Sequence, residues 1–302
     1  MNILITGAWQ FSADNIRQIE ELGHKVMILQ YERDPIPYDY KDIDAVICNG
    51  LFLYHPIEKF KNLKYIQLTS AGYDRVPMEY VKENNIQIYN AKGVYSIPIA
   101  EYVVMSILNL YKNAFYFRKN QEKHLWIKNR NILELNNKVV AILGVGSIGH
   151  EIAKRLKAFN TKNIGFDIKV FKDEYFDNIY SINELKEYVD NVDIIISCLP
   201  LVESTKNIID TELFEKVKSD LIVVNISRGG VINEESLMKF IKEKKIFGAI
   251  LDVFEEEPLD KDSELWNLEN IIITPHNSFV SDKNNERLGN LIINNLISIR
   301  EE

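Results

Sequence analysis

The sequence predicts an α/β fold with parallel strands, because short apolar runs alternate with helical patterns along the chain. The runs are apolar on consecutive positions, which is typical of parallel strands covered by helices on both faces. A glycine-rich turn near the middle of the chain begins a second alternating series. A length of 302 residues exceeds that of one ordinary core, so we expect about two domains.

The first series covers about the first 95 residues. Apolar residues at helical spacing predict helices over 12–22 and about 77–83. Between and around them, β-rich runs predict strands at 2–6, 25–29, 45–48, 65–69 and 87–89. These elements together predict one α/β domain.

A long apolar stretch separates the two series. It follows the capping signal "GVYS", and we expect one helix over 97–117. The second series predicts strands at 139–143, 163–166, 193–197, 221–225, 247–251 and 271–274, and helices at 148–158, 181–190, 210–217 and 234–244. A final helix over 281–299 carries an apolar packing stripe of Leu288, Leu291, Ile292, Leu296 and Ile299.

Charge and composition exclude several classes of function. The net charge of -8, with no block of Lys and Arg, argues against a nucleic-acid partner. The N-terminus lacks a signal-peptide pattern, and no apolar run approaches about eighteen residues, so we expect no membrane attachment. Cys48 and Cys198 each end an apolar run and are interpreted as buried strand residues rather than metal ligands. The sequence therefore predicts a cytoplasmic protein without a metal site.

The stretch "GVGSIG" has the glycine spacing of a dinucleotide-binding loop. Gly144, Gly146 and Gly149 follow the predicted strand 139–143 directly and open the predicted helix 148–158. The first glycine allows the turn, the second lets a pyrophosphate approach the backbone, and the third lets helix and strand pack closely. The pattern alone is weak, but its position between a strand and a helix favours a dinucleotide.

Asp167 ends the next predicted strand, eighteen residues after Gly149. A carboxylate at this point can accept hydrogen bonds from both ribose hydroxyls of NAD and would repel the 2′-phosphate of NADP. Lys169 is close enough to weaken that repulsion, and a plain turn-capping role for Asp167 is the alternative. NAD is the favoured cofactor.

Four side chains suited to proton transfer and substrate binding follow predicted strands. Arg228 lies in "NISRGG", Asp252 and Glu257 in "LDVFEEEPL", and His276 in "ITPHNSF". Ligands of open α/β sheets bind at the carboxyl ends of strands, so these residues are candidates for one site. The alternatives are a surface ion pair for Arg228, a loop-capping role for Asp252, a solvated acidic turn for Glu257 and a structural role for His276.

The chain resembles the D-isomer-specific 2-hydroxyacid dehydrogenases. Stretches in that family's order run over nearly the whole chain: "TSAGYDRV", "GVYSIPIAEYVV", "LGVGSIG", "SCLPLVEST", "NISRGGVINEESL", "GAILDVFEEEPL" and "ITPHNSF". The resemblance implies that Arg228, Glu257 and His276 form a catalytic triad for the interconversion of a 2-keto acid and a D-2-hydroxy acid. His276 would act as general acid and base, Glu257 would hold and stabilise its cationic form, and Arg228 would bind the substrate carboxylate.

The resemblance also implies the other binding residues and the architecture. The turn Ala71, Gly72 and Tyr73 would bind substrate together with Arg228 and His276. The residues expected to contact NAD are Ser96, Gly144, Gly146, Ser147, Ile148, Gly149, Asp167, Leu199, Pro200, Thr205, Ile226, Ser227, Asp252 and His276. Both domains would be doubly wound parallel sheets: a flavodoxin-like substrate domain of 1–95 and 281–302, with a Rossmann-type NAD-binding domain inserted at 96–280. The helix after Ser96 would form a homodimer.

Three other functions compete with this interpretation. Formate dehydrogenases share the fold but do not pair a glutamate with the histidine, so Glu257 favours ketone chemistry. Short-chain reductases need Tyr-x-x-x-Lys, which none of the fifteen tyrosines provides. A non-enzymatic NAD(H)-sensing protein, like the co-repressors of this fold, can retain the triad and stays open. The substrate is not evident: Leu51, Phe52 and Tyr54 suggest an apolar substituent or are ordinary core.

Overall fold

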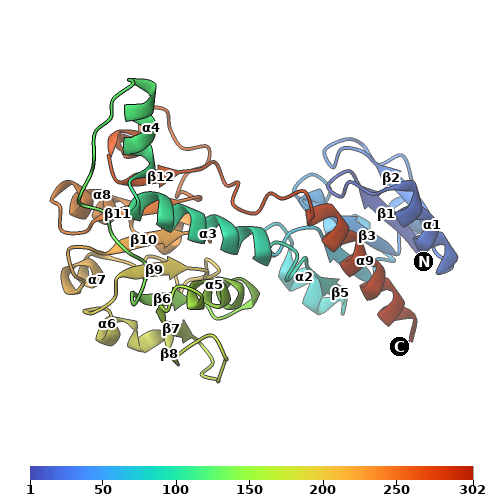
Figure 1. Cartoon of the computed structure of the whole chain (residues 1–302). Coiled ribbons are helices and arrows are strands. Elements are labelled where there is room, and N and C mark those ends of the chain that lie inside the picture. Colours follow the sequence, from blue (N-terminus) through green and yellow to red (C-terminus); the bar gives the residue numbers. More distant parts are fainter. Residues whose placement is uncertain (302) are drawn as a thin grey trace. The chain divides into compact units, whose positions relative to one another are not determined.

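The computed structural model describes residues 1–301 and divides into two compact units, Met1–Tyr95 with the chain from Ser281 onward, and Ser96–Val280 (Figure 1). Each unit contains one sheet in which all the strand pairs are parallel. The predicted pair of parallel α/β sheets is confirmed. Within residues 1–301, no helix has both the length and the apolar character needed to cross a membrane.

The sheet of the first unit has the strand order β2-β1-β3-β4-β5. This is the order of flavodoxin-like folds. Its strands are β1 (Asn2–Thr6), β2 (Lys25–Leu29), β3 (Ala45–Cys48), β4 (Tyr65–Leu68) and β5 (Gln87–Tyr89). β3 and β4 are buried along their whole length, as their uninterrupted apolar sequences predict.

Three helices belong to this unit: α1 (Ala13–Glu21), α2 (Met78–Glu83) and α9 (Asn284–Glu301). Short 3-10 turns lie at Tyr40–Asp42, Leu51–Leu53 and Ile57–Lys59. α1 begins with a capping box in which Ser12 and Asn15 exchange hydrogen bonds through side chain and backbone. The predicted stripe of α9 packs into the core beside β1, with Leu288, Ile292 and Leu296 buried. This packing returns the end of the chain to the first unit.

The sheet of the second unit has the order β12-β11-β10-β9-β6-β7-β8. The order reverses between β6 and β9, which makes the sheet doubly wound in the Rossmann manner. The strands are β6 (Val139–Leu143), β7 (Lys162–Asp167), β8 (Asn178–Ser181), β9 (Ile194–Ser197), β10 (Ile222–Asn225), β11 (Gly248–Leu251) and β12 (Ile271–Ile273). The sequence patterns did not predict β8, a four-residue edge strand with one buried residue.

The helices that follow these strands are α5 (Ser147–Lys157), α6 (Leu185–Tyr188), α7 (Thr211–Lys216) and α8 (Glu234–Lys242). Further 3-10 turns lie at Ile182–Glu184, Gly229–Val231 and Glu264–Asn267. The unit starts with α3 (Ser96–Tyr111), which packs along α5. The loops that carry the candidate site follow the carboxyl ends of β6 and of β9 to β12.

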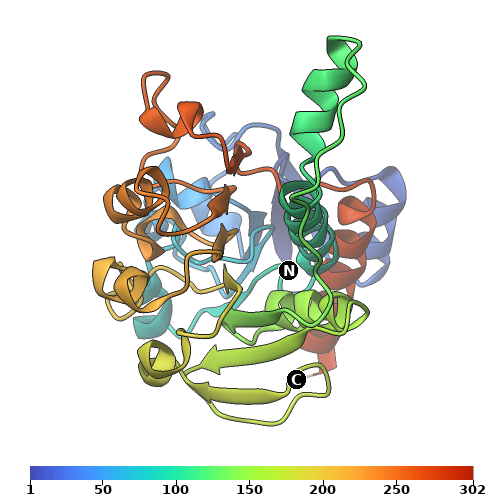
Figure 2. The same cartoon turned by 60° about the vertical axis from the view of Figure 1, so that its left-hand side comes forward.

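The prediction of one helix over 97–117 is wrong. α3 ends at Tyr111, Asn113 adopts a left-handed conformation with φ +52°, and a separate helix α4 (Ala114–Glu122) follows. Asparagine tolerates this conformation better than most residues, so it can break a helix without glycine or proline. α4 extends away from the sheet of its own unit (Figure 2). We call α4 and the segment 123–133 after it the arm.

Candidate active site

The three glycines where β6 passes into α5 are needed for different structural reasons. Gly144 has φ +91°, and a Cβ there would lie 3.0 Å from the carbonyl oxygen of Cys198. A Cβ on Gly149 would lie 2.2 Å from the carbonyl oxygen of Gly144. Gly146, the residue that caps α5, has nothing within 4 Å of its Cβ position and no side-chain cap. The first and third glycines therefore allow close packing, while the second leaves space above the helix N-terminus.

This open space suits the diphosphate of a dinucleotide. The N-terminus of a helix presents unpaired backbone N–H groups and a partial positive charge, both of which favour phosphate. Gly146 is exposed, and Ser147 and Ile148 are half-buried at the first turn of α5. The predicted cofactor residues Gly146, Ser147 and Ile148 therefore lie beside open space at the N-terminus of α5.

Asp167 connects the end of β7 to the glycine loop. Its Oδ2 accepts a hydrogen bond from the backbone N–H of Val145 at 2.8 Å, and its Oδ1 accepts one from the N–H of Lys169 at 3.3 Å. A carboxylate has about four acceptor positions, so two further hydrogen bonds remain available to it. Asp167 can therefore support the glycine loop and also accept hydrogen bonds from ribose hydroxyls.

The other predicted cofactor residues differ in burial and in hydrogen bonding. Leu199 and Ile226 are buried, and Pro200 is exposed. Thr205 accepts from the N–H of Val202 and donates to the carbonyl of Pro200, and Ser227 pairs with Ser197. Ser96 begins α3 and is buried, and its Oγ has no hydrogen-bond partner among the described residues. A buried hydroxyl without a partner can take a ligand hydrogen bond.

His276 and Glu257 lie in direct contact. His276 follows β12 with φ +52°, and its Nδ1 lies 2.9 Å from Oε2 of Glu257. The other carboxylate oxygen, Oε1, accepts a hydrogen bond from the backbone N–H of Phe254 at 3.1 Å. The His276 and Glu257 side chains are 41% and 38% exposed, so solvent or a ligand can reach the pair. A carboxylate on Nδ1 directs the other ring nitrogen, Nε2, outward for proton exchange.

Asp252 holds the loop on which His276 lies. It is fully buried at the end of β11, and its carboxylate accepts from the Thr274 hydroxyl, the Asn277 N–H at 2.8 Å and the Ser278 N–H at 3.0 Å. The backbone N–H of His276 donates to the Asp252 carbonyl at 2.8 Å. These bonds engage both oxygens of Asp252, which the sequence assigned to the cofactor. In the structure Asp252 fixes the left-handed turn that orients His276.

Arg228 follows β10, the strand beside β11. Its Nη1 donates to the Ser227 carbonyl at 2.7 Å, and its own carbonyl accepts from the Asn225 side chain at 2.9 Å. The next residue, Gly229, is pressed against the turn that precedes Glu257, where a Cβ would lie 1.9 Å from the carbonyl carbon of Phe254. All three predicted catalytic residues therefore follow adjacent strands of the second sheet.

The predicted substrate turn lies in the first unit. Ala71, Gly72 and Tyr73 follow β4, and the carbonyls of Ala71 and Gly72 accept from Asn90 and Ser70. Leu51 is buried in the core below, whereas Tyr54 is mostly exposed. Of the two interpretations of Leu51, Phe52 and Tyr54, substrate pocket or ordinary core, the structure supports core for Leu51.

The two thiols do not add to the site chemistry. Burial raises the pKa of Cys48 well above its usual range and that of Cys198 to about 12, so both stay protonated near neutral pH. Among residues 1–301, no group of three or more His, Cys, Asp and Glu side chains is arranged to hold a metal ion.

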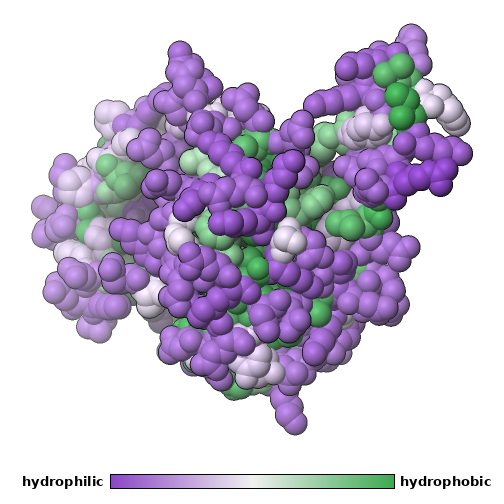
Figure 3. Space-filling model, turned by 90° about the vertical axis from the view of Figure 1, so that its left-hand side faces the viewer, coloured by the Kyte–Doolittle hydropathy of each residue, from purple (hydrophilic) through white to green (hydrophobic). Residues whose placement is uncertain are grey.

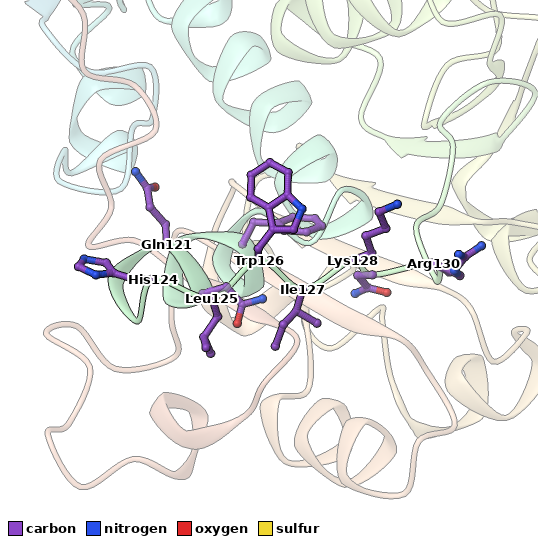
Figure 4. Close-up of a pocket in the computed structure, with 10 residues that line it drawn as sticks. Gln121, His124, Leu125, Trp126, Ile127, Lys128 and Arg130 are labelled. Carbon is purple, nitrogen blue, oxygen red and sulfur yellow. The ribbon is translucent and has the colours of Figure 1, made fainter.

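The sequence patterns missed a cavity on the arm, away from the glycine loop. It has a volume of about 760 Å³ and is lined by side chains of α4 and of the segment after it, including His124, Leu125 and Trp126 (Figure 4). The Trp126 side chain is 97% exposed, and apolar surface is visible on the projecting segment at the upper right of Figure 3. The sequence signal was the aromatic and apolar content of 115–127; the single-helix prediction ended at 117, and no element was predicted for the rest of that segment.

Comparisons with known proteins identify the family. Residues 104–278 match the model of the D-isomer specific 2-hydroxyacid dehydrogenase, NAD binding domain. The chain is 31% identical over 283 residues to D-3-phosphoglycerate dehydrogenase of Methanocaldococcus jannaschii, covering 92% of this chain and 54% of that protein. It is 34% identical over 227 residues to hydroxypyruvate reductase of Thermotoga maritima, covering 73% and 72%.

A solved structure shows the same fold. The probable 2-hydroxyacid dehydrogenase from Rhizobium etli CFN 42, in complex with NADP, HEPES and L(+)-tartaric acid, superposes with a TM-score of 0.79 at 25% identity, over 99% of this chain and 95% of that one. The chain belongs to the family of D-isomer specific 2-hydroxyacid dehydrogenases. It spans about half the length of the D-3-phosphoglycerate dehydrogenase that it matches.

Proposed function

We propose that the protein is an NAD-dependent dehydrogenase that interconverts a 2-keto acid and a D-2-hydroxy acid. The observation that carries the proposal is the 2.9 Å contact between His276 and Glu257 at the carboxyl edge of the sheet that also carries the glycine loop. An imidazole held by a carboxylate is the arrangement that a ketone reduction needs, because a proton must reach the carbonyl oxygen.

The residues have distinct roles in this reaction. The nicotinamide, when bound, supplies the hydride. His276 gives a proton from Nε2 to the keto oxygen during reduction and removes it from the hydroxyl during oxidation. Glu257 stabilises the imidazolium, and Arg228 binds the substrate carboxylate and polarises the C2 oxygen. The backbone amides of Ala71, Gly72 and Tyr73 bind the other oxygen of that carboxylate.

The residues that would hold the cofactor favour NAD over NADP. Gly144, Gly146 and Gly149 give the pyrophosphate access to the N-terminus of α5, and Asp167 accepts from the ribose hydroxyls while repelling a 2′-phosphate. The related structure from Rhizobium etli holds NADP, so the family's fold accommodates both cofactors. The charge of Asp167 is the feature of this chain that supports NAD.

The arm supports a homodimer. Its apolar side chains Phe117, Leu125, Trp126 and Ile127 are all exposed, and exposed apolar clusters of this kind mark protein interfaces. We propose that a second copy of the chain covers them; the family resemblance itself implies a homodimer through the helix after Ser96, which is α3. The protein is proposed to act in the cytoplasm on a small organic acid, with neither nucleic acid nor membrane as partner.

A binding protein that senses NAD(H) without turnover is the alternative, because it could retain the same residues. The test mixes the full-length protein, NADH and a panel of 2-keto acids and follows the NADH absorbance. We expect oxidation of NADH with at least one of them and the D-2-hydroxy acid as product. NADH binding without turnover on any member of the panel would favour the sensor.

A further inference from the structure

The turn that carries Glu257 is joined to the start of α8 by reciprocal hydrogen bonds. The backbone N–H of Glu255 donates to the Glu234 carboxylate at 2.6 Å, and the N–H of Glu234 donates to the Glu255 carboxylate at 3.3 Å. The turn also rests against Gly229, which no larger residue could replace without displacing the backbone of Phe254. The segment 229–234 therefore sets the conformation of residues 254–257.

Glu234 is connected to the proposed acid–base pair through this turn. The N–H of Phe254 donates to Oε1 of Glu257 at 3.1 Å, which leaves Oε2 directed at Nδ1 of His276 at 2.9 Å. A shift of the Glu255 backbone would move Phe254 and, with it, the oxygen that Glu257 presents. Glu234 thus lies one hydrogen bond away from the turn that positions Glu257.

Glu234 carries its charge at a cost to folding. Its pKa is raised chiefly by burial and further by repulsion from Glu255, Glu256 and Glu257, and only the hydrogen bond from Glu255 opposes the rise. A raised carboxyl pKa means that the folded chain binds the proton more tightly than the unfolded chain does. The ionised form is therefore unfavourable at neutral pH, and the cost disappears as the pH falls below the ordinary glutamate range.

We propose that Glu234 is a positioning residue for the His276–Glu257 pair: its carboxylate holds the Glu255 N–H and so fixes the turn that aims Glu257 at His276. This inference rests on the proposed function. The charged groups that act on Glu234 are the three glutamates of the turn, Glu255, Glu256 and Glu257.

Three variants test this role. Glu234→Gln keeps the acceptor and removes the charge, and Glu234→Ala removes both. Glu235→Gln is the matched control, because Glu235 is the next residue of α8 and is exposed. NMR follows the imidazole resonances of the five histidines, with His276 assigned from the spectrum of His276→Ala, and kcat and KM for 2-keto acid reduction are measured on the same variants.

In Glu234→Gln we expect the His276 imidazole resonances and kcat to match the wild type, because the acceptor for the Glu255 N–H is kept. Thermal stability of Glu234→Gln should equal or exceed that of the wild type at neutral pH, and the difference should vanish in acid. Glu234→Ala should shift the His276 resonances and lower kcat about tenfold with unchanged NADH affinity, the loss expected for a misdirected carboxylate. Glu235→Gln should leave all of these quantities unchanged.

Wild-type kcat with unshifted His276 resonances in Glu234→Ala, or the same changes in Glu235→Gln, would overturn the inference. The proposed function fails separately: a wild-type protein that turns over no 2-keto acid contradicts it. Even then, the His276 resonances decide whether Glu234 positions Glu257 against the imidazole.

Discussion

At the scale of single residues, the contact between Nδ1 of His276 and Glu257 determines which ring nitrogen can serve a substrate. Nδ1 is held by the carboxylate and Nε2 is the nitrogen left to exchange a proton. The buried carboxylate of Asp252 fixes the backbone around His276, so the ring is held from two sides. Proton donation by His276 should therefore depend on the charge of Glu257.

Glu257→Gln tests this dependence. Glutamine keeps the size and one acceptor oxygen but loses the charge that stabilises the imidazolium, so kcat for 2-keto acid reduction should fall while NADH binding changes little. The measurement is kcat with a good 2-keto acid, beside the dissociation constant for NADH. Wild-type turnover in Glu257→Gln would show that Glu257 does not act on His276.

Asp167 gives a second prediction at this scale. Asp167→Ala removes the repulsion of a 2′-phosphate and also the acceptor for the Val145 N–H, so we expect weaker NADH binding and a smaller preference over NADPH. Dissociation constants for both cofactors, measured by fluorescence titration, test it. An unchanged ratio of the two constants would contradict the assignment of Asp167 to the ribose.

At the scale of elements, the sequence patterns located most strands within one or two residues because each is a short, continuous apolar run. The prediction failed where tertiary context decided. Asn113 ends α3 through a left-handed conformation that no local pattern marks, and β8 pairs only at the edge of its sheet. The residues of the candidate site were found from motifs, but their contacts were not. The link from Glu234 to Glu255 joins residues 21 positions apart, and only the fold brings them together.

The glycine loop offers a matched pair of substitutions at this scale. A Cβ at Gly146 meets no atom within 4 Å, so Gly146→Ala should fold normally and bind NADH about tenfold more weakly, since the methyl group occupies the space for the pyrophosphate. A Cβ at Gly149 meets a carbonyl oxygen at 2.2 Å, and Gly149→Ala should cost about 1–3 kcal/mol of unfolding free energy. Thermal unfolding and cofactor titration of both variants separate these effects. Equal cofactor affinity in Gly146→Ala and the wild type would remove the loop from the binding site.

At the scale of the whole molecule, the arm is the feature that neither sheet explains. A mostly apolar cluster that includes Trp126 lies at its surface, and such a cluster is unfavourable in water unless a partner covers it. Trp126→Asp should therefore convert the proposed dimer to a monomer at micromolar concentration. Trp266→Asp is the control, because Trp266 is also exposed but lies off the arm. Sedimentation equilibrium measures the mass of each. A wild-type monomer, or an unchanged dimer in Trp126→Asp, would refute the role of the arm.

The most direct test of the account measures steady-state turnover and NADH affinity side by side for the wild type and His276→Ala. Loss of a positioned acid–base group should lower kcat for 2-keto acid reduction by roughly 10²–10⁴-fold, while the dissociation constant for NADH changes little. Near-normal turnover in His276→Ala would contradict the central claim that this imidazole carries the proton.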